Sequence, residues 1–212
     1  MCSKKSRRIP SLVIKNSCAY FSIQHTTQKY LGDPINIVKI LSDYGADEIA
    51  IFVKDFASLD VCMMLPYYCT RPISISGMPI DFQLLDKLLT SGYDRLGFSI
   101  KDAKYYADLS LRYGNSTLIL HLNEIKMFEK ITNLQKNFSE IIYHDLFLSG
   151  SRIGLDRAKV SYLESLSKKC EVSVEGGFNQ HKDKDVPISV YYSSEFIFRN
   201  NDLESVNICP VI

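Results

Sequence analysis

The sequence has no tryptophan and no excess of charge of either sign. Its 212 residues include 25 lysines and arginines against 24 aspartates and glutamates, a formal net charge of +1. This balance gives no electrostatic reason to expect nucleic acid or an anionic membrane as the main partner. No run approaches the roughly 20 apolar residues of a membrane helix, and residues 1–10 lack the apolar segment of a signal peptide. We therefore expect a cytoplasmic protein.

Metal-site and redox motifs are also missing. No two of the six cysteines have the C-x-x-C spacing, and the four histidines form no H-E-x-x-H pattern. Free cysteine often packs as a small hydrophobic residue, so we expect buried thiols. We expect neither a metal nor a cofactor.

The chain does contain a repeating alternation of short apolar runs and helix-like segments. The eight apolar runs lie at 9–15, 47–53, 71–77, 94–100, 116–122, 140–147, 170–176 and 187–193. The helix-like segments lie at 34–45, 81–92, 102–114, 127–138 and 156–169; three end in glycine, and several begin with Asp or with Pro in the first turn. Such alternation predicts parallel strands with right-handed crossovers, and eight units predict a (β/α)₈ barrel.

The predicted barrel is a trimmed one. We expect a single domain over 1–212, with a disordered basic tail at 1–6, in a fold that usually takes about 250 residues. The segment "GFNQHKDKDV" (177–186) is too short and polar for a crossover helix. Outer helix seven should therefore be missing, and helices two and eight should be short. The flank exposed in this way is either a partner surface or a tolerated deletion.

Charged residues stand at the beginnings of four predicted strands. Arg7, Glu48, Arg95 and Glu140 precede the apolar parts of strands one, two, four and six. Two bases and two acids could form a ring of alternating sign on the lumen floor, where mutual neutralisation makes burial tolerable. Charges also solvate strand ends, so the ring is either functional or structural.

Alternation along each strand predicts which residues face the lumen. Counted from the charged ring, the inward set is Ser11, Ala50, Ser74, Ser76, Gly97, Ser99, His121, Asn123, His144, Ser173, Glu175 and Tyr191. Most barrels fill the lumen with bulky aliphatic side chains, so this small, polar set predicts room for water or a small neutral molecule. Two interpretations of His121, His144 and Glu175 are open: they meet and handle protons, or they form a structural hydrogen-bonded trio.

Two longer stretches carry a family resemblance. "QKYLGDPINIVKILSDYGADEIAIF" (28–52) and "SEIIYHDLFLSGSRIGLD" (139–156) resemble the cyclase subunit of imidazole glycerol phosphate synthase, of the histidine-biosynthesis type. The likeness is closest to a divergent branch associated with bacterial surface-polysaccharide gene clusters. It runs in order from about Arg7 to Phe198.

The resemblance implies a partner and a passage. In that family the barrel sits on a class I glutaminase, and ammonia enters the barrel through a charged gate at its bottom. The gate positions match Arg7, Glu48, Arg95 and Glu140, and Asp94 matches an acid that contacts the glutaminase. A heterodimer with a glutaminase is therefore expected, and a downstream sugar-amidating enzyme is a further possible partner.

The resemblance also implies that the original chemistry is lost. The two cyclase carboxylates, one after strand one and one after strand five, match Val13 and Asn123, neither of which can ionise. The family's first-loop lysine matches Phe21. At the first phosphate site Met78 replaces a glycine, and Ser99 replaces an asparagine.

The second phosphate site of the family is better kept. Its predicted residues are Ser149, Gly150, Gly176, Gly177, Ser193 and Ser194. Glycines let backbone N–H groups approach an oxyanion, although glycines in turns often serve backbone conformation alone.

Three functions remain open from the sequence. The first is a conduit subunit that docks a glutaminase and passes ammonia toward amidation of a surface-sugar precursor. The second is a phosphosugar-binding lyase or cyclase-type enzyme in which His121, His144 or Glu175 replaces the lost acids. The third is a non-catalytic scaffold.

Overall fold

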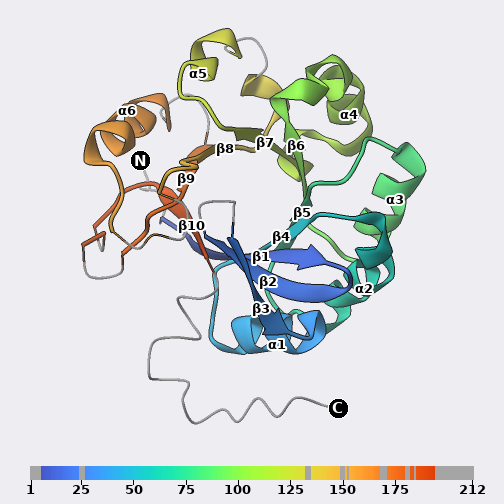
Figure 1. Cartoon of the computed structure of the whole chain (residues 1–212). Helices are drawn as coiled ribbons and strands as arrows, with labels where there is room; N and C mark the ends of the chain where they lie inside the picture. The colour runs from blue at the N-terminus through green and yellow to red at the C-terminus, as the bar shows by residue number, and fades with distance from the viewer. Residues whose placement is uncertain are drawn as a thin grey trace.

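The protein is a (β/α)₈ barrel (Figure 1). The computed structural model describes residues 6–23, 27–131, 135–148, 151, 153–167, 171–179, 182–183 and 185–193. Eight parallel strands close into a barrel, because the last strand pairs with the first as well as with its predecessor. These strands are β1 (Arg8–Lys15), β4 (Ile49–Val53), β5 (Ile73–Ser76), β6 (Arg95–Ser99), β7 (Leu118–Leu122), β8 (Glu140–His144), β9 (Glu171–Glu175) and β10 (Ser189–Ser193).

The helices lie outside this ring of strands, as Figure 1 shows. The α-helices are α1 (Pro34–Asp43), α2 (Leu59–Met64), α3 (Phe82–Thr90), α4 (Tyr106–Tyr113), α5 (Met127–Lys130) and α6 (Arg157–Ser167). The 3₁₀ helices are η1 (Phe56–Ser58), η2 (Leu65–Tyr68), η3 (Ile100–Tyr105), η4 (Asn115–Thr117) and η5 (Gln135–Asn137). The main hydrophobic core lies between the outer strand faces and these helices.

Local sequence signals set the helix boundaries. The side chain of Asp33 accepts the backbone N–H of Asn36 and so caps α1, with Pro34 in the first turn. Asp81 caps α3 in the same way. After α1, Gly45 has a φ of 90°, a left-handed conformation that glycine adopts without strain.

The predicted shortening of the outer ring is confirmed where the structure describes it. Helix α2, which follows the second barrel strand, has only six residues. Between β9 and β10 the described residues form turns and bends and no helix. The segment after β10, where helix eight was expected to be short, and residues 1–5 of the expected tail lie outside the described residues.

Three features differ from the prediction. An antiparallel hairpin, β2 (Cys18–Ile23) and β3 (Thr27–Gly32), extends from the end of β1, where no strand was expected. In the described part of the helix expected at 127–138, α5 covers only four residues and η5 lies further along. Between β6 and α4, residues 100–105 are 3₁₀ rather than α-helical.

Candidate functional site

A cluster of buried charges occupies the lumen at the N-terminal ends of the strands. Arg7 Nη1 lies 2.6 Å from Glu48 Oε2, and Arg7 Nη2 lies 2.8 Å from Glu140 Oε2. Arg95 forms ion pairs with the same two acids. The side chains of Glu48 and Glu140 are only 2% and 0% exposed, so the four residues predicted as a ring do meet across the barrel axis.

Three further residues complete this cluster. Glu171 Oε1 lies 2.7 Å from Arg7 Nη2, so a third acid, which the sequence reasoning missed, joins the cluster. The Tyr191 hydroxyl donates to Glu140 Oε2 at 3.0 Å, and the Ser173 hydroxyl donates to the other oxygen of Glu140. The sequence signal for Glu171 was its place at the start of β9, level with Glu140 on β8.

The cluster holds Glu140 and the two arginines ionised. Burial by itself would raise the pKa of Glu140, but Arg95 and Arg7 lower it below the ordinary value. Burial would likewise lower the pKa of each arginine, but their acidic and tyrosine neighbours raise it above the ordinary value. The floor of the lumen is therefore a network of fixed, opposite charges.

Asp94, the predicted docking residue, is exposed beside this floor. Its Oδ2 accepts the backbone N–H of Ile73 at 2.8 Å, at the start of the neighbouring strand β5. One oxygen of the Asp94 carboxylate is therefore held by a backbone hydrogen bond. The side chain is exposed, so the other oxygen is accessible.

An apolar layer lies above the charged cluster. Its members are Ile9, Ala50, Ile119, Ile142 and Tyr191, with Phe52 packed against them. The expectation of a small, polar lumen throughout is therefore wrong at this level, because Ile9, Ile119 and Ile142 share the inward parity and were left out of the inward set. Any solute passing this layer leaves water and its hydrogen bonds behind.

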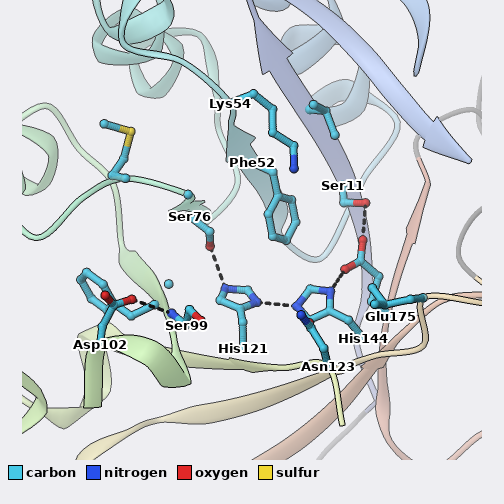
Figure 2. A pocket seen from close by; sticks show the side chains of 16 residues that line it. Ser11, Phe52, Lys54, Ser76, Ser99, Asp102, His121, Asn123, His144 and Glu175 are labelled. Carbon is cyan, nitrogen blue, oxygen red and sulfur yellow. Dashed lines mark hydrogen bonds and ion pairs between the residues drawn. The ribbon is translucent and has the colours of Figure 1, made fainter. Parts of the chain in front are cut away.

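A chain of hydrogen bonds crosses the lumen above the apolar layer (Figure 2). Ser76 Oγ lies 2.8 Å from His121 Nε2, and His121 Nδ1 lies 2.6 Å from His144 Nε2. His144 Nδ1 pairs with Glu175 Oε2. The five side chains from Ser76 to Ser11 come from five different strands, and Ser11 ends the chain by donating to Glu175 Oε1 at 3.3 Å.

Packing holds the side chains of this hydrogen-bonded chain in a single arrangement. The ring of Phe52 lies edge-on to both imidazoles, with centroid distances of 5.4 Å to His121 and 5.9 Å to His144. Burial and the neighbouring His144 lower the pKa of His121 to about 3, so its imidazole is neutral at pH 7. Gly97 leaves room for the hydrogen-bonded side chains, because a Cβ at that position would overlap Ser76 Oγ and His121 Nε2.

The hydrogen-bonded chain forms the floor of a cavity of about 400 Å³ at the C-terminal ends of the strands. A cavity of this size suits a small molecule. The lining residues besides Ser11, Ser76, His121, His144 and Glu175 are Val13, Phe52, Lys54, Gly77, Met78, Gly97, Phe98, Ser99, Asp102, Asn123 and Leu146. In Figure 2 the Lys54 side chain points into this space, and Asp102 lies on another side of it.

The cavity brings together most positions predicted for the catalytic face. Val13 and Asn123, which match the lost carboxylates, both line it, as do Met78 and Ser99. Phe21 instead lies buried on β2 and is not among the lining residues. The sequence reasoning missed Lys54 and Asp102; Lys54 follows the inward parity of β4 just beyond the end of that strand.

The predicted second phosphate site is described only in part. Gly176 and Gly177 both have left-handed backbone conformations, with φ of 125° and 72°. The carbonyl oxygen of Gly177 accepts the N–H of Gly154 at 2.8 Å, and a Cβ on Gly177 would lie 2.7 Å from the oxygen of Gly154. This close approach gives Gly177 a structural reason to be glycine. Ser149, Gly150 and Ser194 lie outside the described residues, as does the side chain of Ser193, so phosphate binding stays a prediction.

Neither a metal cluster nor a membrane span emerges from the described part of the chain. Among these residues no three His, Cys, Asp or Glu side chains form a group that could hold a metal ion. None of the described helices is long and apolar enough to cross a membrane.

Comparison with known proteins finds distant relatives of this chain. No family model matches the chain. It is 22% identical over 131 residues to the "Putative imidazole glycerol phosphate synthase subunit HisF" of Leptospira interrogans, covering 56% of this chain and 50% of that protein. It is 24% identical over 128 residues to the "Putative imidazole glycerol phosphate synthase subunit hisF3" of Vibrio vulnificus, covering 56% and 49%.

A third relative matches over a longer stretch. The "Putative imidazole glycerol phosphate synthase subunit HisF" of Leptospira borgpetersenii is 20% identical over 204 residues, covering 82% of this chain and 80% of that protein. The chain spans about half the length of the first two relatives. These likenesses support a barrel subunit of the cyclase type.

Proposed function

We propose that this chain is the barrel subunit of a glutamine-dependent amidotransferase. In this proposal a class I glutaminase docks on the bottom of the barrel, and its ammonia enters through the cluster of Arg7, Glu48, Arg95 and Glu140. The observation that carries the proposal is this buried charge cluster, combined with Val13 and Asn123 at the positions of the cyclase acids. The cluster lies where such a subunit would have its entrance, and neither Val13 nor Asn123 can act as a carboxylate; both facts support the proposal.

The burial of so many charges needs a reason beyond stability. Replacing a buried ion pair by well-packed apolar residues is often neutral or stabilising, so such a network is weak evidence for a purely structural role. The cluster contains two guanidinium groups and three carboxylates between bulk solvent and the apolar layer. A gate that opens by rearranging ion pairs needs groups of this kind.

The apolar layer supports ammonia as the solute that passes. Burying an isolated ammonium ion among Ile9, Ile119 and Ile142 is costly, whereas neutral ammonia loses only hydrogen bonds. The charged floor and the apolar layer together favour the neutral species. The chain of histidines above them contains the first polar groups that such a solute would meet.

The bottom face offers exposed aromatic side chains to a partner. Tyr67 is 79% exposed, and Tyr68 and Tyr44 are also exposed. Their segments adjoin, because Thr70 bonds Ser42 near the end of α1. Tyrosine is enriched in protein interfaces. Asp94 adjoins this surface, because it accepts the backbone N–H of Ile73 at the start of β5, the strand that follows Tyr67 and Tyr68. We infer that this surface is part of the glutaminase contact.

The acceptor that we propose is a phosphorylated sugar precursor. It rests on the resemblance of the sequence to the surface-polysaccharide branch. The amidated product would form in the cavity above the histidine chain or in a downstream enzyme. The two glycines at 176 and 177 would supply backbone N–H groups to a phosphate.

The proposal is tested by co-expression with a class I glutaminase encoded beside this chain. We expect a stable complex and glutamine-dependent transfer of nitrogen to a sugar acceptor. Arg95→Glu or Glu48→Lys should abolish transfer from glutamine or prevent docking. Arg112→Glu is the matched charge reversal, because Arg112 pairs with Asp86 on the outer helices. The proposal is wrong if both gate variants behave like Arg112→Glu.

A second candidate function is an enzyme with altered catalytic residues. The observation that favours it is the chain from His121 to Glu175 on the cavity floor. His121→Ala should then abolish turnover with free ammonium, whereas a pure conduit would show little change. A scaffold through whose lumen no molecule passes is less well supported, because the Arg7 side chain points into the lumen and the cavity is open.

A further inference from the structure

The hydrogen bonds across the upper lumen have a direction that follows from their terminal group. An ionised Glu175 can only accept, so His144 Nδ1 carries the proton of that bond. In a neutral His144, Nε2 must then accept from His121 Nδ1–H. His121 is neutral, so its Nε2 in turn accepts from the Ser76 hydroxyl. Every donor along the chain therefore points from Ser76 toward Glu175.

This arrangement can move one proton without leaving a charge on either imidazole. When the Ser76 hydroxyl passes its proton to His121 Nε2, His121 can release the proton on Nδ1 to His144 Nε2. His144 can release its own Nδ1 proton to Glu175. Both histidines change tautomer and stay neutral, and Glu175 ends protonated. Such a transfer suits a buried pair of imidazoles, because no intermediate requires a buried imidazolium.

The two ends of this hydrogen-bonded chain differ in their chemistry. Ser76 and Glu175, which are 6% and 7% exposed, both line the cavity, as does Lys54, whose side chain points into it (Figure 2). Ser76 ends the chain with a hydroxyl, whereas Glu175, which is also bonded to Ser11, ends it with a carboxyl group that can take up a proton. An anionic group of a small molecule can pair with the Lys54 amine while the reacting part of that molecule lies over Ser76.

We propose that Ser76, His121, His144 and Glu175 form a catalytic proton relay that removes a proton from a small anionic substrate or nucleophile held in the upper cavity. The proton transfer itself does not depend on the proposed function. It rests on that function only for the identity of the nucleophile. None of its four residues occupies the positions of the two lost carboxylates, which Val13 and Asn123 fill.

With ammonia as the nucleophile, the atoms and charges balance. The nitrogen lone pair forms a bond to an electrophilic carbonyl carbon, and the carbonyl π electrons move to its oxygen. The nitrogen, now positively charged, loses one proton to Ser76 Oγ as Ser76 gives its own proton to His121. The transfer ends at Glu175, and the adduct keeps one negative charge on oxygen. Returning that proton by the reverse route to the oxygen restores the relay.

The relay can be tested without the glutaminase and without the natural acceptor. 5-Nitrobenzisoxazole is a small probe that opens in a single step when a base removes its C–H proton, and the phenolate product absorbs visible light. We expect saturable elimination by the full chain, above the rate in buffer alone. Glu175→Gln should lower kcat at least tenfold with little change in KM, because a carboxamide can still accept from His144 but cannot take up the proton.

A matched variant and a second measurement exclude a folding defect. Asp108→Asn removes an exposed acid on α4 that is not among the residues lining the cavity, and it should keep the rate of the unchanged protein. Nitrogen-15 NMR of histidine-labelled protein should show Nδ1–H tautomers for both histidines, in the unchanged protein and in Glu175→Gln alike.

Two results would overturn the relay. One is a probe rate no higher than in buffer, and the other is a Glu175→Gln variant with the original tautomers and a kcat within twofold of the unchanged protein. Because the assay contains neither glutamine nor a partner, a negative result leaves the docking proposal standing. Failure of the docking test likewise leaves the relay standing.

Discussion

Arg95 and Glu140 form an ion pair across the floor of the lumen, although one begins β6 and the other begins β8. The strand between them, β7, begins with apolar residues, so the two charged side chains meet inside the barrel rather than along its wall. Glu140 is 0% exposed and also accepts bonds from Arg7 and Tyr191. It is the acid on which most of the cluster converges.

Removing the charge of Glu140 should therefore destabilise the fold strongly. Glu140→Gln leaves two buried guanidinium groups short of one partner, and breaking a buried pair in this way costs about 3–5 kcal/mol. The free energy of unfolding from urea titration measures this loss. Asp86→Asn, which breaks the exposed pair with Arg112, is the control and should cause almost no change. Equal effects of the two substitutions would contradict the description of the cluster as buried and mutually dependent.

A methyl group at Gly97 should disrupt the histidine chain from within. A Cβ there would overlap Ser76 Oγ and His121 Nε2, and overpacking of this kind costs about 1–3 kcal/mol. We expect Gly97→Ala to lower the unfolding free energy by this amount and to shift the His121 resonances in NMR spectra. Ser99→Ala, two residues further along β6, is the control. An unshifted His121 in Gly97→Ala would show that the Ser76 bond is not where the structure has it.

The positions of the barrel strands could be predicted because each strand is a short apolar run with turn signals on both sides. Counting from Arg95 also indicated that Gly97 and Ser99 face inward, because alternation is fixed within a strand. The same counting identified His121 and His144 as inward residues. It could not say that His121 Nδ1 and His144 Nε2 lie 2.6 Å apart, because this depends on the stagger between neighbouring strands.

The failures have equally specific causes. The hairpin of β2 and β3 was missed because residues 16–33 have no Gly or Pro until Gly32, so they carry no turn signal at the hairpin tip. Glu171 was missed because only four strand starts were compared. Ile9, Ile119 and Ile142 were overlooked because isoleucine in a strand normally indicates the outer core, whereas here it also fills one level of the lumen.

Acid should destabilise the protein in the range where His121 remains neutral in the fold. Its pKa is about 3 in the folded protein against an ordinary value of 6.5, so the unfolded chain binds more protons between these values. Stability is therefore full above about pH 6.5 and falls as the pH drops toward 3. The lowered pKa of Glu140 adds to the loss below its ordinary value of 4.5. Melting temperatures at pH 7, 6, 5 and 4 measure the trend.

A variant without the imidazole separates the two contributions. His121→Gln should flatten the part of the curve between pH 6.5 and 4.5, where Glu140 stays ionised in both states. The fall below pH 4.5 should persist. An unchanged slope between pH 6.5 and 4.5 in His121→Gln would mean that another group causes the loss of stability there.

The charge of Asp94 can be tested separately from its structural bond. Asp94→Asn keeps an oxygen for the backbone N–H of Ile73 but removes the charge, so the unfolding free energy should stay close to that of the unchanged protein. Asp94→Ala removes both and should cost about 1 kcal/mol of stability. If the charge contacts the glutaminase, calorimetry should show that both substitutions weaken binding about equally. Asp47→Asn is the matched control, because Asp47 is also exposed and accepts the backbone N–H of Arg8 at 2.8 Å. Binding by Asp94→Asn as tight as by Asp47→Asn would limit Asp94 to holding the start of β5.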